Sequence, residues 1–207
     1  MSSFTVSVVD TVCLFQPSNG FYHVDASATA MPEIGPDTDH TEAFDADTAA
    51  LKDAWAATRE DMKALASEYE DEGWDTLTIS AGDTAPEPPE AGDENRFGLA
   101  HVIPDNRAEA FTEAHAAGEF PRYDVFRNEA AGRVFLVTVL LDPASETAIL
   151  LAGSFERHLS TELAQAASEA DEMYTHVQTL DGTQLGSFRH DDPEKFFPGA
   201  DAVPRDD

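Results

Sequence analysis

Two apolar runs near the middle of the chain are separated by a short polar turn. The first run spans Val134 to Leu141 and is rich in β-branched residues, and the second begins at Ala148 and ends at Gly153. The turn between them opens with Asp142 and Pro143. Continuous apolar runs of this length on either side of a turn indicate strands that are buried on both faces. The pattern therefore predicts a hairpin at the centre of a β-sheet.

Three segments carry apolar residues at helical spacing, and the sequence predicts helices over 47–72, 106–117 and 157–172. Asp105 is expected to cap the second helix, and Gly73 and Gly118 are expected to end the first and second. The residues predicted to face inward are Trp55, Arg59, Met62, Leu65, Ala66 and Tyr69 in the first helix, Ala108, Phe111 and Ala114 in the second, and Leu159, Leu163, Ala166 and Ala170 in the third.

The remaining strands are predicted over 74–80, 97–103, 123–128, 173–180 and 183–190, the last two joined by Asp181 and Gly182 as a second hairpin. Residues 82–95 hold several prolines without periodicity, which predicts a surface loop. Strands outnumber helices and the turns between strands are short. The fold class expected is α+β, an antiparallel or mixed β-sheet with about three helices packed on one face.

The domain boundaries follow from composition. Residues 1–30 contain two acidic residues and no lysine or arginine, and a sequence rich in acidic residues begins directly after Met31. We favour Met31 as the natural start, which makes 1–30 a non-native extension or a disordered segment. A signal peptide, disfavoured by the lack of a basic start, and a genuine strand at 4–9 are the alternatives. Residues 31–46 are expected to be a linker, 47–198 a single α+β domain and 199–207 a disordered tail.

Charge is the strongest compositional signal. The chain has 12 basic and 41 acidic residues, a formal net charge of −29, and three lysines. Hydrophobic content is 42%, which is enough for a core and excludes an acidic disordered chain. Such self-repulsion destabilises a folded protein in dilute salt and is screened in concentrated salt. The composition therefore indicates a halophilic protein; an acidic protein of ordinary salt is the alternative.

Several classes of protein are disfavoured. Cys13 is the single cysteine, so the chain has neither an internal disulfide nor a cysteine-based zinc site. No apolar run is long enough to span a membrane, and the basic residues form no stripe for nucleic acid. We therefore expect a cytoplasmic protein without membrane or nucleic-acid partners. A homodimer or a protein partner bound through a sheet edge or face is the expected kind of association.

The second hairpin carries the main candidate site. Strand alternation across the Asp181-Gly182 turn pairs Tyr174 with Arg189 and His176 with Ser187, on one face that also holds Gln178. A histidine can exchange protons near neutral pH, and an arginine can hold a carboxylate or phosphate with two hydrogen bonds. Tyr174, His176 and Arg189 are therefore the candidate catalytic residues for acid–base chemistry on a small anion. The alternative, which we favour, is a polar solvent face of the sheet.

Two weaker clusters also contain histidine. His190, Asp191, Asp192 and Glu194 could ligate a hard cation, and His158 lies one helical turn from Glu162. In an acidic chain both are better explained as exposed polar groups. Phosphate-binding, dinucleotide-binding and nucleophile-elbow motifs are absent from the sequence. The sequence therefore predicts neither a metal nor a cofactor.

Three blocks of sequence resemble an uncharacterised family of haloarchaeal proteins. They are Phe97 to Pro104, Arg133 to Thr138 and, above all, Met173 to Pro198. The resemblance extends over about 50–198 and leaves out the first 30 residues. It implies a haloarchaeal origin and assigns neither an activity nor site residues. The function expected is a domain that binds a small molecule or a protein partner; the alternative is an enzyme acting on a small anionic metabolite.

Overall fold

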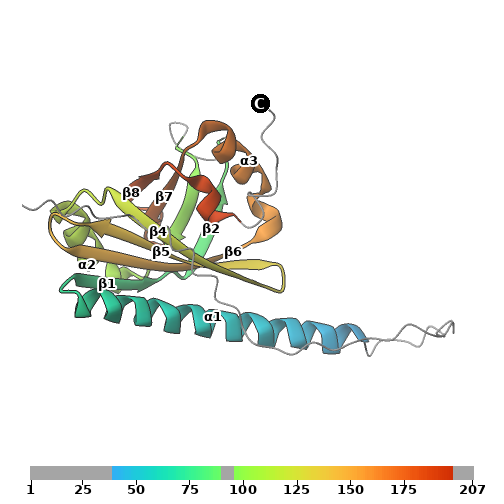
Figure 1. Cartoon of the computed structure of the whole chain (residues 1–207). Helices are drawn as coiled ribbons and strands as arrows, with labels where there is room; N and C mark the ends of the chain where they lie inside the picture. The colour runs from blue at the N-terminus through green and yellow to red at the C-terminus, as the bar shows by residue number, and fades with distance from the viewer. Residues whose placement is uncertain (1–38, 90–95, 198–207) are drawn as a thin grey trace, which may run out of the picture. The chain divides into compact units, whose positions relative to one another are not determined.

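The computed structural model describes residues 39–89 and 96–197, with side chains from residue 47 onward. The predicted α+β class is confirmed, because the described residues form three α-helices and two four-stranded mixed sheets. The strands divide between these two sheets instead of forming one (Figure 1). The proposed extension 1–30, the start of the linker at 31–38, the possible strand at 4–9 and the tail 199–207 lie outside the described residues.

The first sheet, called sheet A here, has the strand order β1-β6-β5-β4. The predicted central hairpin is confirmed as β5 (Arg133–Asp142) and β6 (Thr147–Glu156), which pair in antiparallel fashion. The Asp142 carboxylate holds the turn by accepting hydrogen bonds from the Ala144 backbone N–H at 3.2 Å and the Ser145 hydroxyl at 2.7 Å. This side chain–backbone bond explains why the turn opens with aspartate.

Two further strands complete sheet A. β4 (Arg122–Ala130) pairs antiparallel to β5, and the tight turn between them places Ala131 and Gly132 at positive φ, as the twist of a hairpin requires. β1 (Asp75–Ser80) pairs parallel to β6 at the other edge. On β1, Ile79 is buried and Leu77 packs against the same apolar cluster.

The second sheet, called sheet B here, has the order β2-β3-β7-β8. β3 (Gly98–Val102) pairs parallel to β7 (Met173–Gln178), which pairs antiparallel to β8 (Gln184–His190). The prediction of a continuous loop over 82–95 was wrong in part, because β2 (Asp83–Glu87) pairs antiparallel to β3. Pro86 lowered the strand signal of this segment. Proline is tolerated there because β2 is an edge strand, in which every second backbone N–H points away from the sheet and has no partner in the ladder.

α1 (Asp39–Asp71) begins before residue 47, so part of the predicted linker is helical. The helix covers the face of sheet A that points away from sheet B (Figure 1), where Met62 and Ala66 pack on Val137, Val139 and Leu150. Trp55, Leu65 and Tyr69 are partly buried against the same cluster, as predicted. Arg59 is exposed instead, and the neighbouring Thr58 is buried and donates to the Ala54 carbonyl.

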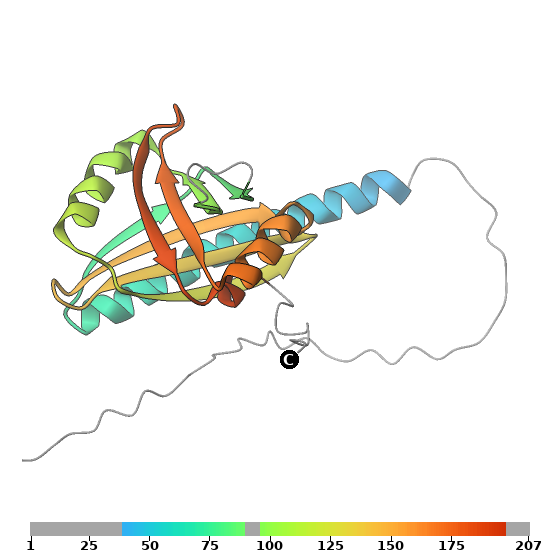
Figure 2. The same cartoon turned by 90° about the horizontal axis from the view of Figure 1, so that it is seen from above.

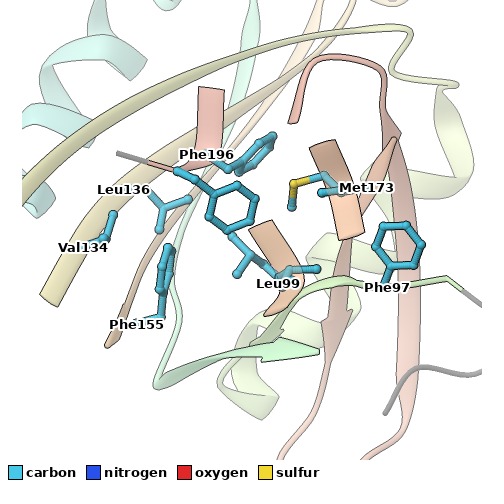
Figure 3. Packing of buried hydrophobic residues seen from close by; sticks show 10 residues of the cluster. Phe97, Leu99, Val134, Leu136, Phe155, Met173 and Phe196 are labelled. Carbon is cyan, nitrogen blue, oxygen red and sulfur yellow. The ribbon is translucent and has the colours of Figure 1, made fainter. Parts of the chain in front are cut away.

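Sheet B packs on the opposite face of sheet A, and its strands β7 and β8 run across those of sheet A (Figure 2). Two apolar clusters fill the space between the sheets. One cluster includes Leu99, Leu136, Phe155, Met173 and Phe196 (Figure 3). The other includes Ile79, Ile103, Phe111, Val177 and Phe188. The core is therefore a sheet-on-sheet sandwich with α1 as a third layer.

The other two helices belong to different clusters. α2 (Asp105–Ala117) contributes Phe111 to the second cluster, and α3 (Thr161–Ala170) contributes Leu163 and Ala167 to the first, beside the 3₁₀ turn η3 (Pro193–Phe196). Asp105 is the first residue of α2, after Pro104, and makes no capping hydrogen bond, so its predicted role was wrong. Along the described segments, no helix has the length and apolar character needed to cross a membrane.

The predicted third helix is divided at Thr161. Its first turn is the 3₁₀ turn η2 (Arg157–Ser160), and α3 follows. A 3₁₀ turn has three residues per turn, so its side chains are rotated relative to those of a continuous α-helix. Leu159 is consequently 58% exposed, although the periodicity predicted it to face inward.

Candidate functional site

The hairpin face that holds the candidate catalytic residues has the predicted register at its central positions. Tyr174 pairs with Arg189 and His176 with Ser187. Gln178 pairs with Gln184, because an irregularity between Val177 and Gln178 shifts the register. The residues of the opposite face are all buried, namely Met173, Thr175, Val177, Phe188 and His190.

His176 is buried although its face of sheet B points away from the core. Its side chain is 4% exposed, and both ring nitrogens have partners. Nε2 lies 2.6 Å from the Arg96 carbonyl oxygen, and Nδ1 lies 2.8 Å from the Ser187 hydroxyl. A carbonyl can only accept, so Nε2 carries the proton and Nδ1 accepts from Ser187. The imidazole therefore ties the segment before β3 to β8.

Tyr174 and Arg189 are held by a shared acidic residue. The Tyr174 hydroxyl lies 3.4 Å from Glu172 Oε1, and Arg189 Nε donates to Glu172 Oε2. This hydrogen bond and the charge of Glu172 raise the pKa of Arg189 above its ordinary value. The Tyr174 ring also stacks on the His176 ring, with 5.8 Å between the centroids. The Arg96 guanidinium lies over the Tyr174 ring, 5.1 Å from its centroid. The structure thus brings the three residues together on one surface of mutually bonded groups.

In the first of the two weaker clusters, the histidine is separated from its acidic neighbours. His190 points into the core, where Nε2 lies 2.8 Å from the Thr175 hydroxyl, whereas Asp191 and Asp192 are exposed. His158 lies on η2 with Nδ1 3.5 Å from Glu156 Oε2. Within the described ranges no group of three or more histidine, cysteine, aspartate or glutamate side chains is placed to hold a metal ion.

A groove of about 430 Å³ lies between α1 and the adjoining ends of β2, β5 and β6. α1 contributes Thr48, Leu51, Lys52 and Trp55, whose spacing places them on one face of the helix. The apolar part of the groove is aromatic, with the Trp55 and Phe135 ring centroids 6.4 Å apart. Its remaining lining residues are Ala81, Gly82, Asp83, Thr84, Arg133 and Ser154. This volume falls within the range of small-molecule sites.

The charge of the groove is opposite to that of the chain. Its lining contains Lys52 and Arg133, from 12 basic residues in the sequence, but only Asp83 from 41 acidic residues. Lys52 is exposed and makes no ion pair with the described residues. Arg133 lies 3.6 Å from Glu156 in an ion pair that is partly open to solvent and therefore weak. The lining of the groove thus combines two cationic residues, one carboxylate, three hydroxyl residues and two aromatic rings.

Sequence reasoning missed this groove because its residues come from three distant segments. In the sequence Arg133 is one of several isolated basic residues. Only the residues on α1 form a recognisable pattern, because 48, 51, 52 and 55 follow the i, i+3, i+4, i+7 spacing of one helix face. All four lie within the predicted helix 47–72, but only Trp55 was assigned to its inward face, so the groove was not recognised.

A line of buried polar residues, called the polar seam here, crosses the inner face of sheet B. It takes one residue from each strand: Thr84, His101, Thr175 and His190. His101 Nδ1 lies 3.2 Å from the Thr84 hydroxyl, and His190 Nε2 bonds to Thr175. Thr138 of β5, fully buried, faces the seam from sheet A. The seam separates the two apolar clusters, and Thr84 connects it to the groove.

Both seam histidines are neutral at pH 7. Burial, together with the nearby His176, lowers the pKa of His101 to about 4. Burial likewise lowers the pKa of His190 to about 3, although the charge of Asp191 opposes the change. A neutral imidazole has one N–H and one acceptor nitrogen, so each ring can make one hydrogen bond of each kind.

Comparison with known proteins places the chain in a family. Residues 41–198 match the model of a family of unknown function, DUF7529. The chain belongs to this family. No curated protein and no solved structure matches the chain. The DUF7529 match includes both sheets, the groove and the polar seam, and it begins within α1, which confirms an uncharacterised family as the resemblance implied.

Proposed function

We propose that the domain is a binding module for a small anionic molecule that carries an apolar group, held in the groove beneath α1. The observation that carries the proposal is the reversed charge of the groove. In a chain of net charge −29, a partly buried site lined by Lys52 and Arg133 provides a local potential that attracts anions. Arginine recognises carboxylate and phosphate groups through paired hydrogen bonds.

The groove also supports the expectation of an apolar group on the ligand. Trp55 and Phe135 provide a tilted pair of rings, and Leu51 and Ala81 extend the apolar lining. The Thr84 hydroxyl is positioned by His101 and can give the ligand its orientation. A ligand with an anionic end and a ring at the other end would therefore use every part of the lining.

The test is thermal unfolding of the whole chain in concentrated KCl with inorganic phosphate, citrate, benzoate and adenosine monophosphate as probes. A ligand at one hundred times its Kd stabilises the native state by about 2.7 kcal/mol. For a domain of this size that corresponds to a rise of ~5–10 °C in melting temperature. We expect benzoate or the nucleotide to exceed citrate and phosphate, because only these two probes carry a ring.

Charge-matched variants locate the site. Lys52→Gln and Arg133→Gln should each remove most of the rise, while Lys63→Gln, an exposed cation elsewhere on α1, should leave it unchanged. An equal loss in all three variants would show a non-specific charge effect, and a rise that persists in Lys52→Gln and Arg133→Gln would reject the groove.

The alternative is an enzyme that acts on a small anionic metabolite through Tyr174, His176 and Arg189. Its support is that the structure brings these groups together. It requires His176 to exchange a present partner for substrate, because both ring nitrogens are bonded. The same probe series separates the two proposals: a rise lost in Arg189→Gln but retained in Lys52→Gln would favour the hairpin surface over the groove.

The partner supported by the sheet topology is a second copy of this chain, paired through the edge strand β4. β4 is long, mostly exposed, and carries Phe126 at 39% exposure. Its charges balance, with Arg122 and Arg127 against Asp124 and Glu129. In an antiparallel pair centred on Phe126, Tyr123 opposes Glu129, Val125 opposes Arg127 and Asp124 opposes Asn128, so no like charges meet.

This association is tested by measuring molar mass in solution, in concentrated KCl, by light scattering after size exclusion. Phe126→Lys should convert a dimer to a monomer by placing two like charges opposite each other. Leu180→Lys changes an equally apolar residue, 86% exposed at the β7–β8 turn, and should have no effect. A monomeric wild-type protein, or a dimer that tolerates Phe126→Lys, would refute pairing through β4.

The proposed setting for these functions is the salt-rich cytoplasm of a halophilic archaeon. The support is the excess of acidic residues, which are spread through the chain, together with only three lysines. Molar salt screens the repulsion between these charges. In such a solvent a ligand is retained by its desolvated contacts more than by long-range charge, which is consistent with an aromatic groove.

A further inference from the structure

We propose that the polar seam binds an internal water molecule between the two sheets, held by His101, Thr138 and His190. Three buried atoms have no hydrogen-bond partner among the described residues: His101 Nε2, Thr138 Oγ1 and His190 Nδ1. All three belong to side chains that are at most 1% exposed. A buried polar group without a partner costs about 1–3 kcal/mol, and three such groups in one layer of the core indicate a shared ligand.

The register places the three residues in one region of the core. Thr138 pairs with Leu151 on one side and Val125 on the other. The next residue of β6 that faces sheet B is Gly153, which lies against the His101 ring. The next such residue of β4 is Tyr123, whose ring centroid is 4.3 Å from that of His190. Thr138 therefore lies on the central strand of sheet A between the contacts that the two histidines make.

Sheet B gives the same placement from the other side. His101 lies on β3 and His190 on β8, with β7 between them. Thr175 of β7 bonds to His190, and its neighbour Val177 pairs with His101. The two imidazoles thus approach Thr138 from either side of β7. Residues of both sheets contribute to one small polar region enclosed by the apolar clusters.

The numbers of donors and acceptors match one water molecule. His101 Nδ1 bonds to the Thr84 hydroxyl and His190 Nε2 to the Thr175 hydroxyl, and a hydroxyl can donate or accept. His101 Nε2 and His190 Nδ1 are therefore each left as either a donor or an acceptor, according to the tautomer of the ring. The Thr138 hydroxyl can likewise act in either role. Water has two protons and two lone pairs, so one molecule can bond to all three atoms whichever tautomers the two rings adopt.

Other occupants fit this set less well. An anion would need a compensating positive charge, whereas both seam histidines are neutral at pH 7. A divalent transition metal prefers at least three histidine, cysteine or carboxylate ligands, and the seam offers two imidazoles and a hydroxyl. A larger organic molecule would displace the apolar side chains of both clusters. Water is the small molecule that can both donate and accept at one site.

The first test is ¹⁵N NMR of the whole chain labelled at histidine. The proposal requires His101 Nε2 and His190 Nδ1, the two nitrogens without a protein partner, each to show the shift of a hydrogen-bonded imidazole nitrogen. The shift of an unbonded nitrogen at either position would overturn it.

The second test counts long-lived internal waters by magnetic relaxation dispersion of the water nuclei. Thr138→Val removes the donor without changing the shape of the side chain, and should remove one long-lived water from the count. Thr58→Val, a buried hydroxyl on α1 that already has a partner, should leave the count unchanged. The same count in wild type and Thr138→Val would contradict the proposal. If Thr138→Val does not fold, the two nitrogen shifts of the wild-type protein still decide the question.

Discussion

Gly153 lies directly against the ring of His101. A Cβ atom at position 153 would be 2.7 Å from His101 Cε1, 2.9 Å from His101 Nδ1 and 2.5 Å from the Thr84 hydroxyl oxygen. Carbon atoms in proteins do not approach this closely without displacing their neighbours. The missing side chain on β6 therefore gives the His101–Thr84 pair its place between the sheets.

We expect Gly153→Ala to destabilise the protein by about 1–3 kcal/mol, because the added methyl group overpacks a rigid core. Denaturant unfolding in concentrated KCl measures this as a lower midpoint with an unchanged slope. Gly82→Ala is the matched control. A Cβ at Gly82 meets only the Val102 carbonyl oxygen, at 3.8 Å, so its effect should stay within about 0.5 kcal/mol. Equal effects of the two variants would contradict the assignment of Gly153 as a packing site.

Acidification should destabilise the protein through the seam histidines. Their pKa values are about 4 and about 3 in the folded state, against about 6.5 in the unfolded chain. Between pH 6.5 and these values the unfolded chain binds more protons, so the free energy of unfolding falls as pH falls. Each histidine contributes a slope of up to ~1.4 kcal/mol per pH unit. The stability present above pH 6.5 is thus lost progressively toward pH 4.

The measurement is denaturant unfolding across pH 7 to 4.5 in concentrated KCl, which limits the effect of the many carboxylates. His101→Gln keeps a polar side chain but does not titrate there, and should have the shallower slope even though it is less stable at pH 7. His158→Gln changes a histidine whose side chain is 72% exposed and should keep the wild-type slope. A wild-type slope in His101→Gln would show that other groups dominate.

His176 is predicted to act as a structural residue. His176→Phe leaves the Arg96 carbonyl and the Ser187 hydroxyl without their present partners, and we expect a loss of about 1–3 kcal/mol in unfolding free energy. His158→Phe is the exposed control and should change stability by less than about 0.5 kcal/mol. A His176→Phe protein of wild-type stability would show that these bonds do not contribute to the free energy of unfolding. It would then favour a functional role for the imidazole.

Salt should stabilise the protein over a wide range. With a net charge of −29, repulsion between carboxylates is strong when the Debye length is ~30 Å in 0.01 M salt and weak when it is ~3 Å in 1 M salt. The melting temperature should therefore rise steadily with KCl, and NaCl should act similarly if screening is the cause. A melting temperature independent of salt would contradict the halophilic assignment.

The sequence predicted those parts of the fold that depend on local pattern. The apolar runs at β5 and β6 and the alternation of β7 and β8 identified both hairpins and the residues that share one face of the second. The pattern could not show that the strands form two sheets, because β1 joins β6 and β3 joins β7 across most of the domain. It also missed β2, since Pro86 lowers the strand propensity that pairing with β3 overrides.

The candidate sites show the same division. Cross-strand pairing placed Tyr174 beside Arg189 and His176 beside Ser187 correctly, because a short turn fixes register. It did not reveal the hydrogen bond between His176 Nε2 and the Arg96 carbonyl, since that bond joins segments far apart in the chain. The groove and the polar seam are likewise assembled from several segments each. His101 belongs to no motif in the sequence, and only the packing of the sheets shows it to be a buried part of the core.

The two parallel strand pairs also determine the order in which the domain can fold. β1 pairs with β6 starting at Asp75 and Thr147, and β3 pairs with β7 starting at Gly98 and Tyr174. The β4-β5-β6 meander needs only short loops and can form first, whereas distant pairings are slow because closing a long loop costs entropy. On the ribosome, neither sheet can close until β6 and β7 have emerged. Until then β1 has no partner and the β2–β3 pair has an open edge, so nascent chains that end before Thr147 are the ones we expect to be most prone to aggregate.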